Sequence, residues 1–197
     1  MALATLEQFK RHLGFKDADT QYDAKLTFFL DAASKWVESY CERIFDETIY
    51  TEFMHGNGSN ILNPRQWPIS AISEVRISLD RDWTSSDTLL DATDYGIEQN
   101  GLSILLFSTL SPIGYNVVRV IYTAGYASIP EDIQFANILA GEWFYKNNNR
   151  GDSGRTSIGK QGENASLLED VPKIVRTILQ SYKRFEVPSS ALGAVRL

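Results

Sequence analysis

The spacing of apolar residues changes period twice along this chain, and this change constrains the fold more than any other feature. Up to about residue 45, apolar side chains recur every three or four residues, as they do on one face of a helix. From residue 48 to residue 124 they alternate with polar residues between glycine-containing turns, which indicates strands. From Pro130 the helical spacing returns. The sequence therefore predicts an α+β protein in which helices flank an antiparallel β region.

The helical pattern occurs in four stretches. Thr5 followed by Gln8 matches a capping box, so a short helix is expected to begin there and to end at Gly14. The other three helices are expected over about residues 20–45, 130–146 and 171–186. Apolar residues expected to face the core include Tyr40 and Cys41 on the second helix, Trp143 on the third and Ile174 on the last.

The middle of the chain is expected to form strands at residues 48–54, 71–79, 94–99, 102–107 and 115–123. The third and fourth of these flank Asn100-Gly101. This dipeptide suits a type I′ hairpin turn, because both central residues of that turn need a positive φ. A polar loop at 80–91 carries Trp83.

Because helices are expected at both ends, we predict a mainly helical bundle of about four helices with an inserted antiparallel β-sheet and hairpin region, in one domain overall. The N-terminal helices would occupy 1–47, the inserted β region 48–126 and the C-terminal helices 127–187. Residues 147–166 are rich in glycine, serine and asparagine and are expected to form a flexible loop. Residues 188–197 would form a tail.

The formal net charge of −6 opposes a general nucleic-acid binder, but the charge is unevenly distributed. Residues 1–145 carry 10 basic and 20 acidic side chains, a net charge of −10. Residues 146–197 carry 9 basic and 5 acidic side chains, a net charge of +4. The two parts are therefore expected to face different partners.

Signals for enzymatic chemistry are weak. The two histidines, His12 and His55, lack metal-ligand spacing, and the single cysteine, Cys41, occupies a helical position that suits a small apolar residue. We therefore expect no catalytic residue, no metal and no cofactor. The charged start of the chain and its short apolar runs predict a soluble intracellular protein without membrane contact.

The last predicted helix offers the most specific candidate for binding, because its charges repeat at helical spacing on an otherwise acidic chain. Its basic face consists of Lys173, Arg176, Lys183 and Arg184. The tail that follows Pro188 is apolar and basic. A binding role and a merely solvated face are both open for these residues.

A hypothesis from a different class places the activity in the β region. A small enzyme or a ligand- or carbohydrate-binding module could use a pocket lined by Trp67, Trp83 and Tyr95. Binding of a small ligand by a persistent monomer would favour this alternative.

The order and spacing of several segments resemble the head-to-tail connector, or adaptor, proteins of long-tailed bacteriophages and prophages. The segments are LEQFKRHLG, YCERIF, YTEFMHGNGSNILNPRQWPISAISEVRI, YGIEQNGLSILLF and NVVRVIYTAGYASIPEDIQFANILAGEWFY. With the final helix they cover about residues 3–186. The last segment is the most telling, because a strand ends in Tyr-Thr-Ala-Gly-Tyr and Ile-Pro-Glu-Asp-Ile opens the next helix.

This resemblance implies a structural virion protein at the head–tail interface, made in the cytoplasm of a host bacterium. Family members form a homo-oligomeric ring, commonly twelve-fold, that joins the capsid portal to the stopper or tail-completion protein and helps to retain packaged DNA. DNA would pass through the lumen without sequence-specific binding, and an acidic body suits such a channel because like charges repel. A stopper or tail-completion protein of the same connector is an alternative identity.

The resemblance also implies that the C-terminal segment engages the portal, while the β region faces tail-side partners or neighbours. The candidate portal-binding residues are Lys183, Arg184, Phe185, Val195, Arg196 and Leu197. Basic groups among them would pair with portal carboxylates, and apolar ones would fill grooves. The candidates for tail-side or neighbour contact are Trp83, His55 and Asn57.

Overall fold

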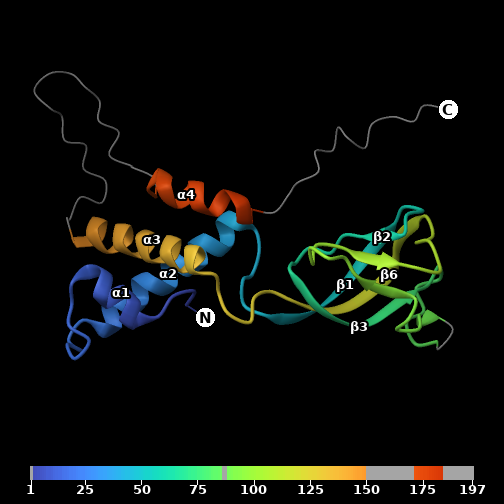
Figure 1. The fold of residues 1–197 in the computed structure, drawn as a ribbon, viewed down its shortest axis with the longest axis horizontal. Helices are drawn as coiled ribbons and strands as arrows, with labels where there is room; N and C mark the ends of the chain where they lie inside the picture. Colours follow the sequence, from blue (N-terminus) through green and yellow to red (C-terminus); the bar gives the residue numbers. More distant parts are fainter. Residues whose placement is uncertain (1, 86–87, 150–170, 184–197) are drawn as a thin grey trace, which may run out of the picture. The chain divides into compact units, whose positions relative to one another are not determined.

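A computed structural model describes residues 2–85, 88–149 and 171–183, and these residues form two compact units (Figure 1). One unit comprises Met1–Arg43 together with the chain from Pro130 onward, and the other comprises Ile44–Ile129. The helices of the first unit are α1 (Leu6–Leu13), α2 (Asp23–Cys41), α3 (Glu131–Asn149), α4 (Lys173–Leu179) and a short 3₁₀ helix, η2 (Gln180–Tyr182). The strands of the second are β1 (Thr48–Gly56), β2 (Ile61–Leu62), β3 (Ile69–Ile77), β4 (Tyr95–Ile97), β5 (Ile104–Leu106) and β6 (Gly114–Ala124).

The prediction of a mainly helical bundle is wrong. The described residues form four α-helices and two three-stranded antiparallel sheets, and the sheets enclose a hydrophobic core of their own. The fully buried residues of that core include Val75, Val118, Val120, Tyr122 and Ile104. Periodicity along the chain indicates the type of each element, but it cannot show that strands from distant segments share enough buried surface to make a second core.

The helical unit begins with the predicted capping box, which is confirmed. The Gln8 N–H donates to Thr5 Oγ1 over 3.2 Å, and the Thr5 N–H donates to Gln8 Oε1 over 2.8 Å. Gly14 ends α1 with a φ of 80°. These bonds satisfy backbone groups that the first turn of a helix leaves without partners, which explains why so short a helix forms here.

The C-terminal ends of three helices differ from the prediction. Helix α2 ends at Cys41, four residues early, because Glu42 adopts a left-handed conformation and its N–H bonds back to the carbonyls of Glu38 and Ser39. Helix α3 continues to Asn149, so the first three residues of the predicted flexible loop are helical. Helix α4 and η2 together end at Tyr182. The rest of the predicted loop and the tail at 188–197 lie outside the described residues.

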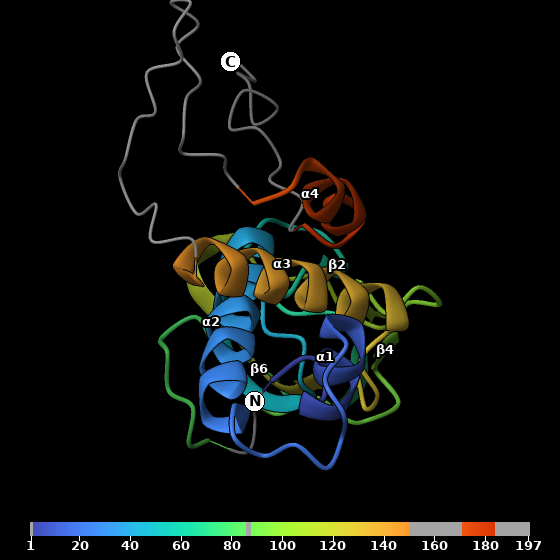
Figure 2. The same cartoon turned by 90° about the vertical axis from the view of Figure 1, so that its left-hand side faces the viewer.

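Helix α3 lies between α1 and α4 in the helical unit (Figures 1 and 2). Phe9 on α1, Leu26 and Leu30 on α2 and Ile138 on α3 form the centre of one buried cluster. Lys10, only 3% exposed, forms an ion pair of 2.8 Å with Asp23. Its ammonium also donates to two loop carbonyls, so the connection between α1 and α2 is fixed by one buried cation.

Strand β6 is the centre of the larger sheet, which has the order β1-β6-β3. The smaller sheet has the order β2-β5-β4 and contributes Leu62, Ile104 and Leu106 to the same core. The expected β4–β5 hairpin is present, but its turn is not type I′. Gly101 has a positive φ of 68°, whereas Asn100 does not, and the Gly101 N–H bonds to the carbonyl of Glu98.

None of the helices in the described ranges combines the length and the apolarity that crossing a membrane requires.

Candidate binding surfaces

A groove of about 730 Å³ lies in the helical unit along one side of α4. One wall consists of Lys173, Arg176 and Thr177 of α4 and Gln180 at the start of η2, which are spaced i, i+3, i+4 and i+7 and therefore lie on one side of the helix. Tyr40 from α2 and Trp143 from α3 line the groove as well, together with Val171 and Pro172. The lining thus combines two cations with two aromatic rings.

The orientation of α4 follows from the residues that it buries. Val171, Val175 and Leu179 are buried at intervals of four residues, which directs the neighbouring stripe of Lys173 and Arg176 toward the groove. Ile174 was predicted to face inward, and this is wrong, because 56% of its side chain is exposed. On a helix of only seven residues, the buried face is narrow and consists of Val175 and Leu179. Ile174 lies outside this face and is exposed to solvent.

The aromatic wall is held in place by neighbouring rings and by a further cation. Tyr40 stacks on Trp36 with ring centroids 5.2 Å apart and an interplanar angle of 12°. The Lys183 Nζ lies 5.3 Å from the centroid of the Tyr40 ring, within the range of a cation–π interaction. Trp143 packs edge to face on Phe144. Tyr40 and Trp143 were predicted to face the core, whereas both are half-buried and line the groove.

A second surface lies on the larger sheet, where a loop covers part of its outer face. Trp83 packs on Phe53 of β1 with ring centroids 5.5 Å apart, and the Arg119 guanidinium lies 5.8 Å from the centre of the Trp83 ring. Phe53 and Arg119 are direct neighbours across strands β1 and β6. The predicted contact residue Trp83 therefore rests on side chains that sequence reasoning did not single out.

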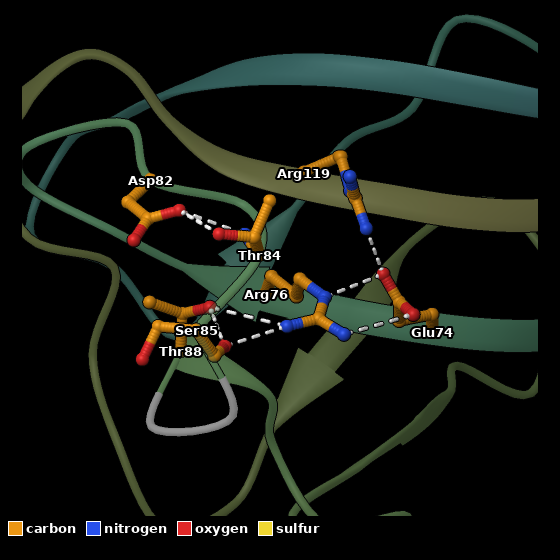
Figure 3. Close-up of polar contacts among 7 residues, drawn as sticks. All are labelled: Glu74, Arg76, Asp82, Thr84, Ser85, Thr88 and Arg119. Carbon is orange, nitrogen blue, oxygen red and sulfur yellow. Dashed lines mark hydrogen bonds and ion pairs between the residues drawn. The ribbon is translucent and has the colours of Figure 1, made fainter.

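Two arginines meet beside this loop, and one carboxylate joins them (Figure 3). Arg76 and Arg119 are paired across β3 and β6, an arrangement that is unfavourable for like charges. Glu74 accepts hydrogen bonds from both guanidinium groups. Arg76 also donates to the Ser85 carbonyl over 2.8 Å and to Thr88 Oγ1 over 3.3 Å, which ties the loop to the sheet.

Three carboxylates in and beneath this loop, those of Glu74, Asp80 and Asp82, have lowered pKa values. Hydrogen bonds from Arg76 and Arg119 hold the pKa of Glu74 below its ordinary value. In the loop, hydrogen bonds from Ser78 and from the Asp82 N–H lower the pKa of Asp80, and bonds from Thr84 lower the pKa of Asp82. The charged forms of these side chains therefore stabilise the loop that presents Trp83.

Replacing Glu74 with glutamine is expected to lower the free energy of unfolding at pH 7 by about 1–2 kcal/mol, because two neighbouring guanidinium groups would lose their shared anion. Since the folded pKa of Glu74 is depressed, its contribution is present above the unfolded value of about 4.5 and disappears as the pH falls through the folded value. Denaturant unfolding of both proteins between pH 3 and pH 7 should show a difference that shrinks toward acid pH.

The control for this experiment is Glu98→Gln, a substitution of the same type in the same unit. It is expected to change the free energy of unfolding by less than about 0.5 kcal/mol. An equal effect of the two substitutions at pH 7, or a difference between wild type and Glu74→Gln that does not vary with pH, would contradict the assigned role of Glu74.

Comparison with known proteins decides the family of this chain. The sequence model of the head completion proteins matches residues 2–185. The chain belongs to the head completion protein family. The predicted resemblance to head-to-tail connector proteins is thereby confirmed, and the chain is a structural protein of the head–tail interface of a phage-like virion.

Solved structures with the fold of this head completion protein come from gene transfer agent (GTA) particles. A chain from the neck of an empty GTA particle, computed with C6 symmetry, gives a TM-score of 0.60 at 16% identity, over 94% of this chain and 91% of that one. A chain from the virion of a native particle gives 0.58 at 16% identity, with the same coverage. A chain from a native neck computed with C12 symmetry gives 0.58 at 15% identity, over 92% and 89%. No curated protein matches the sequence.

The predicted portal-binding residues of this head completion protein divide into two groups. Of the predicted portal-binding residues, Lys183 lies over Tyr40 at the edge of the α4 groove, and Lys173 and Arg176 of the predicted basic helix face lie in the groove itself. The remaining candidates lie outside the described residues: Arg184, Phe185, Val195, Arg196 and Leu197.

The predicted tail-side residues His55 and Asn57 have partners within the β unit. The His55 ring stacks on Tyr115 with centroids 4.4 Å apart, and its Nδ1 accepts a hydrogen bond from the Asn116 N–H. Asn57 Oδ1 accepts from the Ser59 N–H over 2.9 Å and from the Ser111 hydroxyl over 3.2 Å. Asn57 therefore shapes a turn, while His55 remains an exposed ring on β1, two residues from Phe53.

The residues proposed for a ligand pocket have different surroundings. Trp83 packs on Phe53, Tyr95 packs against the β core, and Trp67 precedes Pro68 through a cis peptide bond. The aromatic residues Tyr40 and Trp143 instead line the groove beside α4.

His12 and Cys41 have contacts that assign them structural positions. The Nε2 atom of His12 lies 2.7 Å from a carboxylate oxygen of Glu142, which joins α1 to α3. Cys41 is fully buried, and burial raises the pKa of its thiol to about 11, which disfavours the reactive thiolate. Among residues 2–85, 88–149 and 171–183, no three His, Cys, Asp or Glu side chains gather as metal ligands would.

Proposed function

We propose that this head completion protein is an adaptor: it forms a homo-oligomeric ring, twelve-fold when assembled, that joins the capsid portal to the stopper or tail-completion protein. The observation that carries the proposal is the family match over residues 2–185. The fold shared with chains from GTA necks computed with C6 and C12 symmetry supports a ring. In this role the protein acts through its surfaces and performs no catalysis.

The two surfaces described above suit contacts with two different partners. The basic residues Lys173, Arg176 and Lys183, with the C-terminal segment, would engage the portal, where carboxylates would be their partners. The β unit, through Trp83, His55 and Asn57, would contact tail-side proteins or neighbouring copies. Aromatic side chains at a protein surface are frequent in protein contacts.

Retention of packaged DNA is the second part of the proposal. Residues 1–145 carry 10 basic against 20 acidic side chains, so a ring built from them would present little positive charge to a phosphate backbone. DNA affinity depends on cationic contacts with phosphates, so an acidic lumen would let DNA pass without holding it. The ring would retain DNA by supporting the closed connector.

Deleting residues 188–197 is expected to leave a folded protein that no longer joins capsids. The test compares the wild type and the truncated protein by circular dichroism, and then by their incorporation into portal-containing heads, scored by negative-stain microscopy. Light scattering of the purified protein with and without portal provides a second measurement. Normal incorporation of the truncated protein would refute the portal contact, and a monomer that ignores the portal while binding a small ligand would refute the adaptor role.

A further inference from the structure

The α4 groove has the chemical character of a peptide-binding site. It combines two cations on α4 with the rings of Tyr40 and Trp143, and its volume of about 730 Å³ lies in the range of ligand sites. Lys183 adds a third cation above the Tyr40 ring. We propose that this groove binds an acidic peptide segment of a partner protein, with an aromatic or aliphatic anchor seated between Tyr40 and Trp143.

The aromatic rings argue for an apolar anchor. Tyr40 and Trp143 are half-buried and supported from behind by Trp36 and Phe144, so they are already held in place before a ligand arrives. Rigid, partly exposed aromatic side chains lose little conformational entropy on binding and are frequent in the energetic centres of interfaces. An inserted phenylalanine or leucine side chain would complete their burial.

The cations argue for carboxylates on both sides of that anchor. Lys173 and Arg176 stand on the first turn of α4, whereas Lys183 follows the end of η2. At 1.5 Å per residue, the positions of Lys173 and Lys183 are about 15 Å apart along the helix direction. An extended segment covers this distance in about five residues, so acidic residues two or three positions before and after the anchor would reach both ends.

Charge also favours a peptide over nucleic acid as the occupant. The whole chain has a net charge of −6, and an acidic protein repels a long polyanion while still pairing locally with a few carboxylates. A phosphate chain would in addition leave the apolar part of the groove unfilled. The inference rests on the proposed function in one respect: the protein that supplies the acidic segment would be another protein of the connector.

The experiment measures binding of a synthetic peptide to the purified full chain by titration calorimetry. The peptide is acetyl-Gly-Glu-Glu-Ala-Phe-Leu-Ala-Glu-Glu-Gly-amide. Two comparison peptides carry lysine at the four glutamate positions, or serine at the phenylalanine and leucine positions. We expect saturable binding of the acidic peptide that weakens with added salt, and no binding of either comparison peptide.

The decisive variant is Lys173→Glu, because Lys173 is exposed and its substitution leaves the core intact. It is expected to raise the Kd for the acidic peptide about fivefold to tenfold. Lys16→Glu, a charge reversal at another exposed lysine of the same unit, is the matched control and should leave the Kd unchanged. The double variant Lys173→Glu/Arg176→Glu should bind the lysine peptide instead.

Four outcomes would overturn the proposal. The first is that the full chain does not bind the acidic peptide, as expected if another segment of the chain fills the groove, and the second is that Lys16→Glu and Lys173→Glu change the Kd equally. The third is tighter binding of a (dT)12 oligonucleotide, which Lys173→Glu abolishes. The fourth is self-association in sedimentation that Lys173→Glu abolishes, which would assign the groove to a second copy of the chain. Peptide binding is measured without portal, so it tests the groove separately from the adaptor role. Peptide binding can fail while the protein is still incorporated into heads, and incorporation can fail while the peptide still binds.

Discussion

Replacing Gly125 with alanine is expected to lower the free energy of unfolding of the β unit by about 3–5 kcal/mol. Gly125 follows the end of β6 with a φ of 118°, a conformation that L residues rarely adopt. A Cβ at this position would stand 2.5 Å from the Asp46 carbonyl oxygen and 2.8 Å from the Glu47 Cα. These are backbone atoms, so no side-chain rotation can relieve the contact.

The backbone that would have to move is itself fixed. The Tyr126 N–H donates to the Phe45 carbonyl over 2.8 Å, and Asp46 forms a parallel bridge with Tyr126. Any shift that accommodates the methyl group must therefore break pairing at the point where β1 and β6 begin and end. Urea unfolding followed by far-UV circular dichroism would measure the loss.

Gly58→Ala separates the two causes of this effect. Gly58 also has a positive φ, of 79°, but a Cβ there would meet only the Ile113 side chain at 3.5 Å, an ordinary contact. Its expected cost is about 1–2 kcal/mol, from backbone strain alone. If the two alanine variants were equally stable, the close approach of Gly125 to Asp46 would not be a feature of the protein in solution.

Replacing Phe9 with alanine is expected to destabilise the helical unit by about 3–5 kcal/mol. Phe9 is fully buried and packs with Leu26, Leu30 and Ile138, so its ring joins three helices in one cluster. Truncation removes the buried surface and leaves a cavity that helices held by the same cluster cannot fill. Thermal unfolding with calorimetry would report the change.

Two further variants test this packing. A Cβ at Gly141 would lie 3.2 Å from two ring atoms of Phe9, so Gly141→Ala adds a methyl group directed at the site of the missing ring. The double variant Phe9→Ala/Gly141→Ala is therefore expected to be about 1 kcal/mol more stable than Phe9→Ala. Phe28→Ala, at a ring that is 67% exposed on α2, is the control and should cost less than about 1 kcal/mol. Similar losses for Phe9→Ala and Phe28→Ala would refute the assigned core.

Elements that depend on neighbouring residues were predictable from the sequence. The capping box of Thr5 and Gln8, the left-handed Gly14 and the long strand β6 all follow from interactions or spacings within a few residues. The two-residue strand β2 was missed, because Ile61 and Leu62 form a strand only through pairing with β5. The turn at Asn100-Gly101 also differs, since its register depends on how β4 and β5 pair.

The candidate sites were predictable only in part, for a similar reason. The basic spacing of Lys173 and Arg176 is visible in the sequence, but their aromatic neighbours Tyr40 and Trp143 belong to helices that are distant in the chain. Likewise Trp83 could be singled out as a loop aromatic, whereas Phe53 and Arg119 could not be named as its support. The sequence also does not indicate that Glu74 would bond to both Arg76 and Arg119, because these arginines become neighbours only when β3 and β6 pair.

The amino-acid sequence alone shows the order of the four helices and of the longer strands, the uneven distribution of charge and the family, because periodicity, caps, composition and segment order are properties of the chain as written. Three features emerge solely from how distant segments pack: the strands enclose a core of their own, Ile174 faces solvent, and α4 turns its cations toward Tyr40 and Trp143. Burial and contact are set by which distant segments pack together, and an amphipathic pattern specifies a face without specifying what that face will meet.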